Sequence, residues 1–132
     1  MKALFPHAAT TRGVTVRVAV SYLPEQSHPA AARWFWAYHI RIENEGEQAV
    51  QLIARHWVIR DGNGSVHHVD GEGVVGDQPM IEPGGSYDYV SGCPLNTRSG
   101  SMEGHYDMVA EDGSGFAAII PHFELVGPAV TS

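Results

Sequence analysis

Hydrophobic and polar residues alternate along much of the chain. From Val14 to Tyr22 the residues at every second position are apolar, and polar residues such as Thr15 and Arg17 stand between them. The segment WFWAYHIRIENE, residues 34–45, alternates in the same way, with aromatic and isoleucine side chains on one face. A period of two predicts β-strands that each bury one face.

Seven such runs are separated by segments rich in glycine and proline, which predict turns. They begin near residues 14, 34, 49, 65, 86, 101 and 116. The third run, AVQLIARHWVIRD, is apolar on both faces near its middle, so we expect it to lie centrally in a sheet. We therefore predict an all-β fold, an antiparallel β-sandwich of about seven strands that is immunoglobulin-like in outline.

The same pattern predicts a single domain, residues 1–127, followed by a disordered tail over residues 128–132. Between the fifth and sixth runs, the segment CPLNTRSG, residues 93–100, reads as a loop.

Charge and composition argue against several classes of binding function. The chain has 132 residues with 8 Lys+Arg against 15 Asp+Glu, a net charge of −7. An acidic chain of this kind argues against binding to nucleic acid and to anionic lipid, which both need basic clusters. No apolar run reaches the roughly 18 residues of a membrane span, so we expect no membrane insertion. Cys93 is the only cysteine, and a cytoplasmic location is expected.

The hexapeptide GEGVVG matches the spacing of a dinucleotide-binding turn, with Gly71, Gly73 and Gly76 at the glycine positions. Such a turn works only when a helix begins at the third glycine. Here Pro79 and Pro83 follow, so no helix is expected. We predict that these glycines bend the chain by adopting positive φ or by allowing close backbone packing.

A ligand site at the same loop remains an alternative. Gly71, Gly73 and Gly76, together with Ser91 and Gly92, could form a nest of N–H groups that holds pyrophosphate or a nucleotide. The neighbouring carboxylates Asp70, Glu72 and Asp77 would repel a phosphate unless a cation stood between them.

Three residues could bind a divalent metal. His68, Asp70 and Glu72 share one face if the strand runs that far. One imidazole with two carboxylates suits cobalt, whereas magnesium prefers oxygen ligands. The favoured interpretation is nevertheless an acidic edge that faces solvent.

No catalytic constellation is visible, so we expect no enzyme and no cofactor. Cys93 lacks an identifiable partner that would lower its pKa, and it is interpreted as a small, half-buried loop residue. Phe35 lies on the face opposite Trp34 and Trp36, where it is either an exposed binding patch or covered by a neighbouring segment.

Several long segments of the chain resemble the ApaG family. These are ARHWVIRDGNG, VDGEGVVGDQPMIEPGGSYDYVSGCPL, GSMEGHYDM and IPHFEL, and the resemblance runs from about Val14 to Leu125. Many relatives have Pro in place of Arg98 and Phe in place of Tyr87. The resemblance implies a fibronectin type III-like sandwich, an association with cobalt tolerance and magnesium efflux, and kinship with an interaction domain of eukaryotic F-box and polymerase-interacting proteins. It implies no catalytic residues.

We therefore predict a non-enzymatic module that binds a protein partner and is linked indirectly to divalent-cation homeostasis. The expected recognition surface combines the loop of residues 71–76 with residues 91–100, because loops on a rigid sandwich are a usual place for recognition. The alternative is a small-ligand or metal-dependent phosphate site at the same loops. A homodimer through edge strands is also compatible with the sequence.

Overall fold

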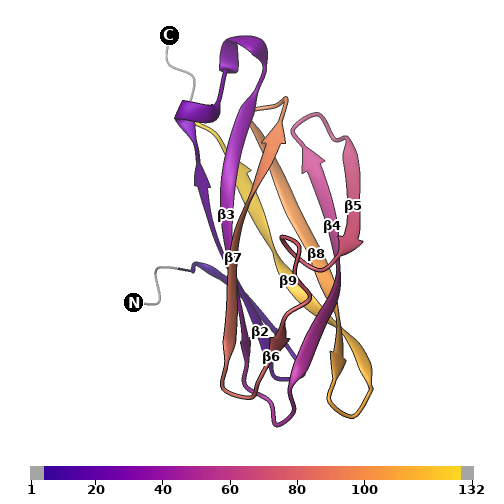
Figure 1. Ribbon diagram of the computed structural model, residues 1–132. Coiled ribbons are helices and arrows are strands. Elements are labelled where there is room, and N and C mark those ends of the chain that lie inside the picture. The colour runs from indigo at the N-terminus through magenta and orange to yellow at the C-terminus, as the bar shows by residue number, and fades with distance from the viewer. Residues whose placement is uncertain (1–4, 129–132) are drawn as a thin grey trace.

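The computed structural model describes residues 5–128 and consists of two antiparallel β-sheets packed face to face (Figure 1). The four-stranded sheet has the order β1-β2-β3-β7, formed by His7–Thr11, Val14–Tyr22, Trp34–Asn44 and Ser86–Leu95. The other sheet has the order β5-β4-β8-β9, formed by Val66–Glu72, Val50–Asp61, Ser99–Ala110 and Gly115–Val126. The short strand β6, Met80–Ile81, also pairs with β4. Two 3-10 turns, η2 (Pro24–Gln26) and η3 (Pro29–Ala31), connect β2 to β3.

The core lies between the two sheets, where alternate side chains of each strand meet. On β3 the inward residues are Trp36, Tyr38, Ile40 and Ile42, all buried, as the alternation predicts. Tyr106 of β8 is likewise buried and faces them from the opposite sheet. Full burial of a single large apolar side chain contributes about 1.5–3 kcal/mol, so these facing rows supply most of the driving force for the fold.

The predicted β-sandwich is confirmed, and β4 lies centrally between β5 and β8 as expected. The structure has nine strands within residues 5–128, against the seven expected. The additional strands are β1, which has the sequence HAATT, and the two-residue β6. Neither has an alternating apolar row, so both depend on backbone pairing with a neighbour that the sequence does not reveal.

The predicted loop over residues 93–100 is wrong. β7 continues through Cys93 and Pro94 to Leu95, and β8 already begins at Ser99. Pro94 pairs in register with Phe35 of β3. A proline is tolerated at this point because β7 is the edge strand of its sheet and needs no N–H donor on its outer side.

A β-bulge in β4 decides which side chains face the core. The pairing of β4 with β8 shifts register between Leu52 and Ala54. Before the bulge the buried residue is Leu52, and after it the buried residue is Trp57, so the inward positions change from even to odd numbers. His56 consequently points to the outer face of the sheet.

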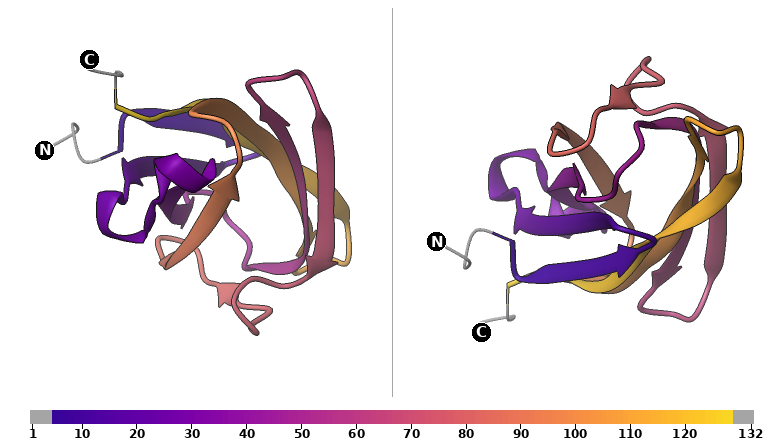
Figure 2. Two further views of the ribbon diagram at one scale, coloured as in Figure 1. Left: turned by 90° about the horizontal axis from the view of Figure 1, so that it is seen from above. Right: turned by 90° about the horizontal axis from the view of Figure 1, so that it is seen from below.

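The two lateral sides of the sandwich differ. Strands β1 and β2 both contact β9, which closes one side, and Figure 2 shows these segments lying against one another in both views. On the other side the outermost strands are β7 and β5. Of the tail predicted from Pro128 onward, residues 129–132 lie outside the described residues, and the predicted domain boundary stays a prediction. No helix within the described chain is long and apolar enough to cross a membrane.

Candidate functional site

The glycine hexapeptide forms the end of β5 and a tight turn. β5 ends at Glu72, and Gly73 has φ +62°. A side chain at Gly73 would also collide with the carbonyl oxygen of Asp77. Val74 and Asp77 exchange backbone hydrogen bonds of 2.8 and 2.9 Å across the turn, and Gly76 has φ +83°. The next regular element is β6, so no helix follows the third glycine, in agreement with the effect expected of the two prolines.

Gly71 has a different role, because it makes room for Arg55 of β4. The two residues are paired in register, and a Cβ on Gly71 would lie 2.8 Å from Nη2 of Arg55. Nη1 of Arg55 donates hydrogen bonds to the carbonyl oxygens of Glu72 at 3.1 Å and Gly73 at 2.9 Å. Among residues 5–128, Arg55 forms no ion pair with a carboxylate. The arginine therefore ties the turn to β4 and keeps Nη2 available for another partner.

A groove of about 250 Å³ lies beside this arginine, between the edge strands β5 and β7. Its walls come from both sheets and combine apolar surface with three polar side chains, Tyr38, Arg55 and Ser91; the other lining residues are Trp57, Ile59, Val69, Gly92, Cys93, Pro94 and Met102. Near the glycine turn, β7 is held by a 3.2 Å hydrogen bond that Tyr87 donates to Asp77. The groove is thus the open side of the sandwich, with an unpaired strand edge on each flank.

Four proton-bearing side chains in the core, Tyr38, Tyr89, Cys93 and Tyr106, are kept neutral by burial. Tyr89 and Tyr106 hydrogen-bond to each other between the sheets, and burial raises the pKa of both phenols. Burial also raises the pKa of Tyr38. The Cys93 thiol is buried in β7 rather than in a loop, and burial raises its pKa to about 11. At neutral pH the thiol is protonated, so it is a poor nucleophile.

The predicted anion nest is only partly assembled. The N–H of Gly73 already donates to Ile53 at 2.8 Å, and that of Val74 donates within the turn. Ser91 faces the groove, whereas Gly92 also lies under Phe35, whose ring a Cβ on Gly92 would approach to 2.6 Å. The pyrophosphate site stays a prediction, with fewer donors than the sequence suggested.

Phe35 is half-buried and lines a larger depression at the end of the sandwich. This depression has a volume of about 810 Å³ and lies between the η2–η3 connection and the end of β7. Pro94 lines both this depression and the groove.

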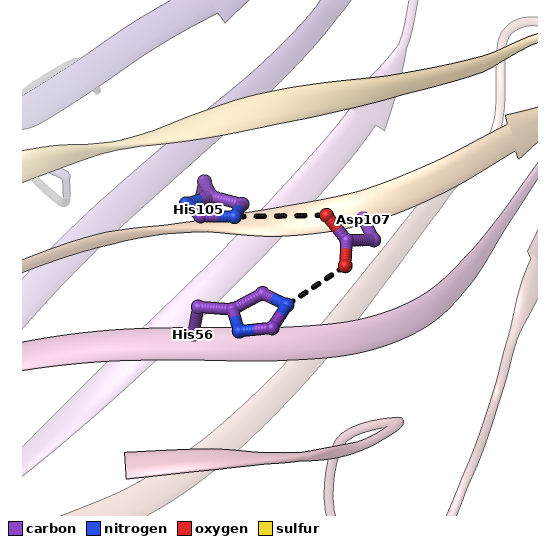
Figure 3. A group of neighbouring side chains, drawn as sticks. All are labelled: His56, His105 and Asp107. Carbon is purple, nitrogen blue, oxygen red and sulfur yellow. Dashed lines mark hydrogen bonds and ion pairs between the residues drawn. The ribbon is translucent and has the colours of Figure 1, made fainter. Parts of the chain in front are cut away.

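A second group of chemically active residues lies on the outer face of the five-stranded sheet (Figure 3). His56 of β4 pairs in register with Asp70 of β5 and with His105 of β8. Nδ1 of His56 lies 2.8 Å from Oδ1 of Asp70, and its Nε2 lies 2.7 Å from Oδ2 of Asp107. The rings of His56 and His105 stack with centroids 4.6 Å apart. We call His56, His105, Asp107 and Asp70 the histidine cluster.

The carboxylates control the charge of His56. Hydrogen bonds to Asp107 and then to Asp70 raise its pKa above the ordinary 6.5. Both ring nitrogens can donate at once only in the imidazolium form, so the two aspartates stabilise that form.

The metal ligands expected from the sequence all lie on one strand, β5. His68, Asp70 and Glu72 do alternate along one face of β5. In the part of the chain that the structure describes, however, the one group of three or more potential ligands that converges is His56, His105 and Asp107, with ligand atoms within 4.8 Å of one another. Asp70 joins this group through His56, and whether His68, Asp70 and Glu72 bind a metal stays a prediction.

Sequence reasoning missed His56 and His105. One local signal was present, because His105 and Asp107 are two residues apart on a strand and must share a face. The position of His56 opposite them depends on the β4–β8 register and on the bulge in β4, which no local pattern specifies.

Comparison with known proteins places the chain among well-defined relatives. The ApaG domain family model matches residues 24–110. Protein ApaG of Maricaulis maris is 54% identical over 117 residues, which cover 89% of this chain and 90% of that protein. Protein ApaG of Stenotrophomonas maltophilia is 50% identical over 120 residues, which cover 91% of this chain and 94% of that protein.

Solved structures agree with this placement. The crystal structure of a protein from Bordetella pertussis described as ApaA superimposes with a TM-score of 0.85 at 45% identity, and the match covers 89% of this chain and 95% of that one. The C-terminal domain of Wzt has a TM-score of 0.55 at 9% identity and is similar in fold alone.

Proposed function

The chain belongs to the ApaG family, and we propose that it is a non-enzymatic module that recognises a protein partner through the groove between β5 and β7. The observation that carries this proposal is the open side of the sandwich. There, two unpaired strand edges flank a groove that has apolar walls and an arginine without a carboxylate partner in the described chain.

The edge of β5 is the better docking strand of the two. Its seven residues contain no proline, whereas β7 carries Pro94, which lacks an N–H donor. An extended segment of a partner can add to such an edge through main-chain hydrogen bonds. Val69, which is 41% exposed and lies on the groove side of β5, would then pack against alternate side chains of that segment.

Arg55 supports a preference for an acidic side chain in the partner. Its guanidinium is fixed by two carbonyl oxygens, so little further ordering is needed when a carboxylate approaches Nη2. A charge-assisted hydrogen bond in a partly buried groove is roughly twice as strong as a neutral one. We therefore propose a partner segment that has apolar residues around a single aspartate or glutamate.

A link to magnesium and cobalt handling, implied by the resemblance to the ApaG family, would run through this partner. The residues that line the groove include no aspartate, glutamate or histidine, so the groove lacks the side chains that magnesium and cobalt prefer as ligands. Partner binding through the groove should accordingly be the same with and without added magnesium.

Paired valine substitutions test this proposal. In Val69→Glu a charge enters the groove, whereas in the control Val109→Glu it enters β8 at a site of similar exposure, 37% against 41%. Partners are captured from a lysate of the source cells with the wild-type chain, identified, and their affinity for each variant is measured. We expect Val69→Glu to weaken binding about tenfold or more, which corresponds to about 1.4 kcal/mol, and Val109→Glu to leave it unchanged.

Circular dichroism confirms that both variants are folded before binding is compared. A partner that binds both variants as tightly as the wild type does not use the groove, and that result would refute the proposed recognition surface.

A further inference from the structure

We propose that the histidine cluster is a binding site for one first-row divalent transition-metal ion such as Zn²⁺ or Co²⁺, with His56, His105 and Asp107 as ligands. This site is on the outer face of the five-stranded sheet and is separate from the groove between β5 and β7. It also differs from the His68, Asp70 and Glu72 set that the sequence suggested.

The first argument is convergence on rigid elements. His56 and His105 lie directly opposite each other on the paired strands β4 and β8, and Asp107 follows two residues further on the same face. Figure 3 shows both imidazoles beside the Asp107 carboxylate, with a dashed line from each. Strands fix their side chains more closely than loops do, so the three ligands are held together before any ion arrives.

The second argument is the spacing of the ligand atoms. A tetrahedral ion with ligands at about 2.1 Å holds neighbouring ligand atoms about 3.4 Å apart. Nε2 of His105 already lies 3.6 Å from Oδ1 of Asp107. Nε2 of His56 lies 2.7 Å from Oδ2 of Asp107, a hydrogen-bond distance that an ion bound to both atoms would lengthen. Both side chains are partly exposed, so this pair can separate by the required few tenths of an ångström.

The third argument is the hydrogen bond on the far side of His56. Asp70 accepts a hydrogen bond from Nδ1 of His56 at 2.8 Å. In metal sites a carboxylate in this position fixes the tautomer and directs the lone pair of the other ring nitrogen to the ion. Asp70 thus occupies the place of an outer-shell partner, and it adds negative charge next to a cation.

The ligand types select the metal. Two imidazole nitrogens with one carboxylate suit zinc, cobalt or nickel, whereas magnesium and calcium take oxygen ligands. Three protein ligands also leave at least one position for water.

Metal titration of the untagged chain tests the proposal. Zn²⁺ binding is measured by isothermal titration calorimetry, and Co²⁺ binding by visible absorption. We expect one ion per chain, and loss of this binding in His56→Ala and in His105→Ala. Asp70→Asn keeps all three ligands and should weaken binding about 10- to 100-fold.

Two further variants serve as controls. His122→Ala removes an exposed histidine that lies 3.4 Å from Glu124 outside the cluster, and His68→Ala removes the histidine suggested by the sequence. Both should bind the ion as the wild type does. Melting curves without metal show that each variant is folded. Absence of stoichiometric uptake by the wild type, equal uptake by His105→Ala, or loss of uptake in His68→Ala would each overturn the proposal.

Discussion

The two lateral sides of the sandwich are built from similar strands, but the sheets are bonded to each other on one side and stay apart on the other. On the closed side, Nε1 of Trp36 donates a 3.1 Å hydrogen bond to the carbonyl oxygen of Val126 in the opposite sheet. The backbone of Ile119 donates to Thr11 at 3.1 Å, which ties β9 to β1. On the open side, Arg55 bonds to carbonyl oxygens of its own sheet and a groove separates β5 from β7.

This difference between the two sides indicates that the closed side contributes mainly to folding stability and the open side mainly to recognition. Where the sheets are joined, edge groups find partners inside the domain and contribute to folding. Where they remain apart, backbone edges, an arginine and apolar surface stay available to another molecule. A substitution on the closed side should therefore change the free energy of unfolding most, and a substitution in the groove should change binding most.

The largest expected effect is at Trp36 of β3, whose indole bonds to β9 of the closed side. Trp36→Ala deletes an indole that is 1% exposed and removes its hydrogen bond to Val126. We expect the free energy of unfolding to fall by about 3–5 kcal/mol in urea denaturation. Val69→Glu in the groove is the comparison variant, and an equal loss in both variants would abolish the distinction between the two sides.

A smaller effect is expected at the buried pair Tyr89 and Tyr106, which connects the two sheets inside the core. Tyr106→Phe leaves the buried hydroxyl of Tyr89 without its partner, which should lower the free energy of unfolding by about 1–3 kcal/mol. The double variant Tyr89→Phe/Tyr106→Phe removes both hydroxyls and should cost less than the sum of the two single changes. Strict additivity in a urea-denaturation cycle would show that the two hydroxyls do not interact.

The smallest effect concerns pH and Cys93, which lines the groove. Burial raises the pKa of its thiol from the ordinary 9.0 to about 11, so the folded chain keeps this proton to a higher pH than the unfolded chain. The resulting contribution to stability is complete below about pH 9 and is lost as the pH rises toward 11. Comparing urea denaturation at pH 8 and pH 10, we expect Cys93→Ala to lose less stability than the wild type. An identical loss would mean that water reaches the thiol through the groove.

Alternation and proline positions in the sequence predicted those parts of the fold that neighbouring residues determine. The alternation in β3 was enough to assign its inward face, and Pro79 and Pro83 were enough to exclude a helix after Gly76. The end of β7 was misread because Pro94 signals a loop in isolation. Its acceptance in a strand depends on where that strand lies in the sheet.

The candidate sites depend on pairing between distant segments, and the sequence alone could not place them. Val69 and Ser91 line the same groove although they belong to different sheets. His56 and His105 meet only because β4 and β8 pair in one particular register. The sequence did identify Gly71 as special, but its reason, the guanidinium of Arg55 lying over it, appears only in three dimensions.

The bulge in β4 determines to which face of the sheet each later side chain of that strand points. If Ile53 took a regular place in the ladder instead of forming the bulge, every later residue of β4 would turn to the opposite face of the sheet. Trp57 would then point into water, while His56 and Arg60 would be driven into the apolar interior. One inserted residue thus determines, in a single step, that this strand supplies an indole to the inside and an imidazole to the outside.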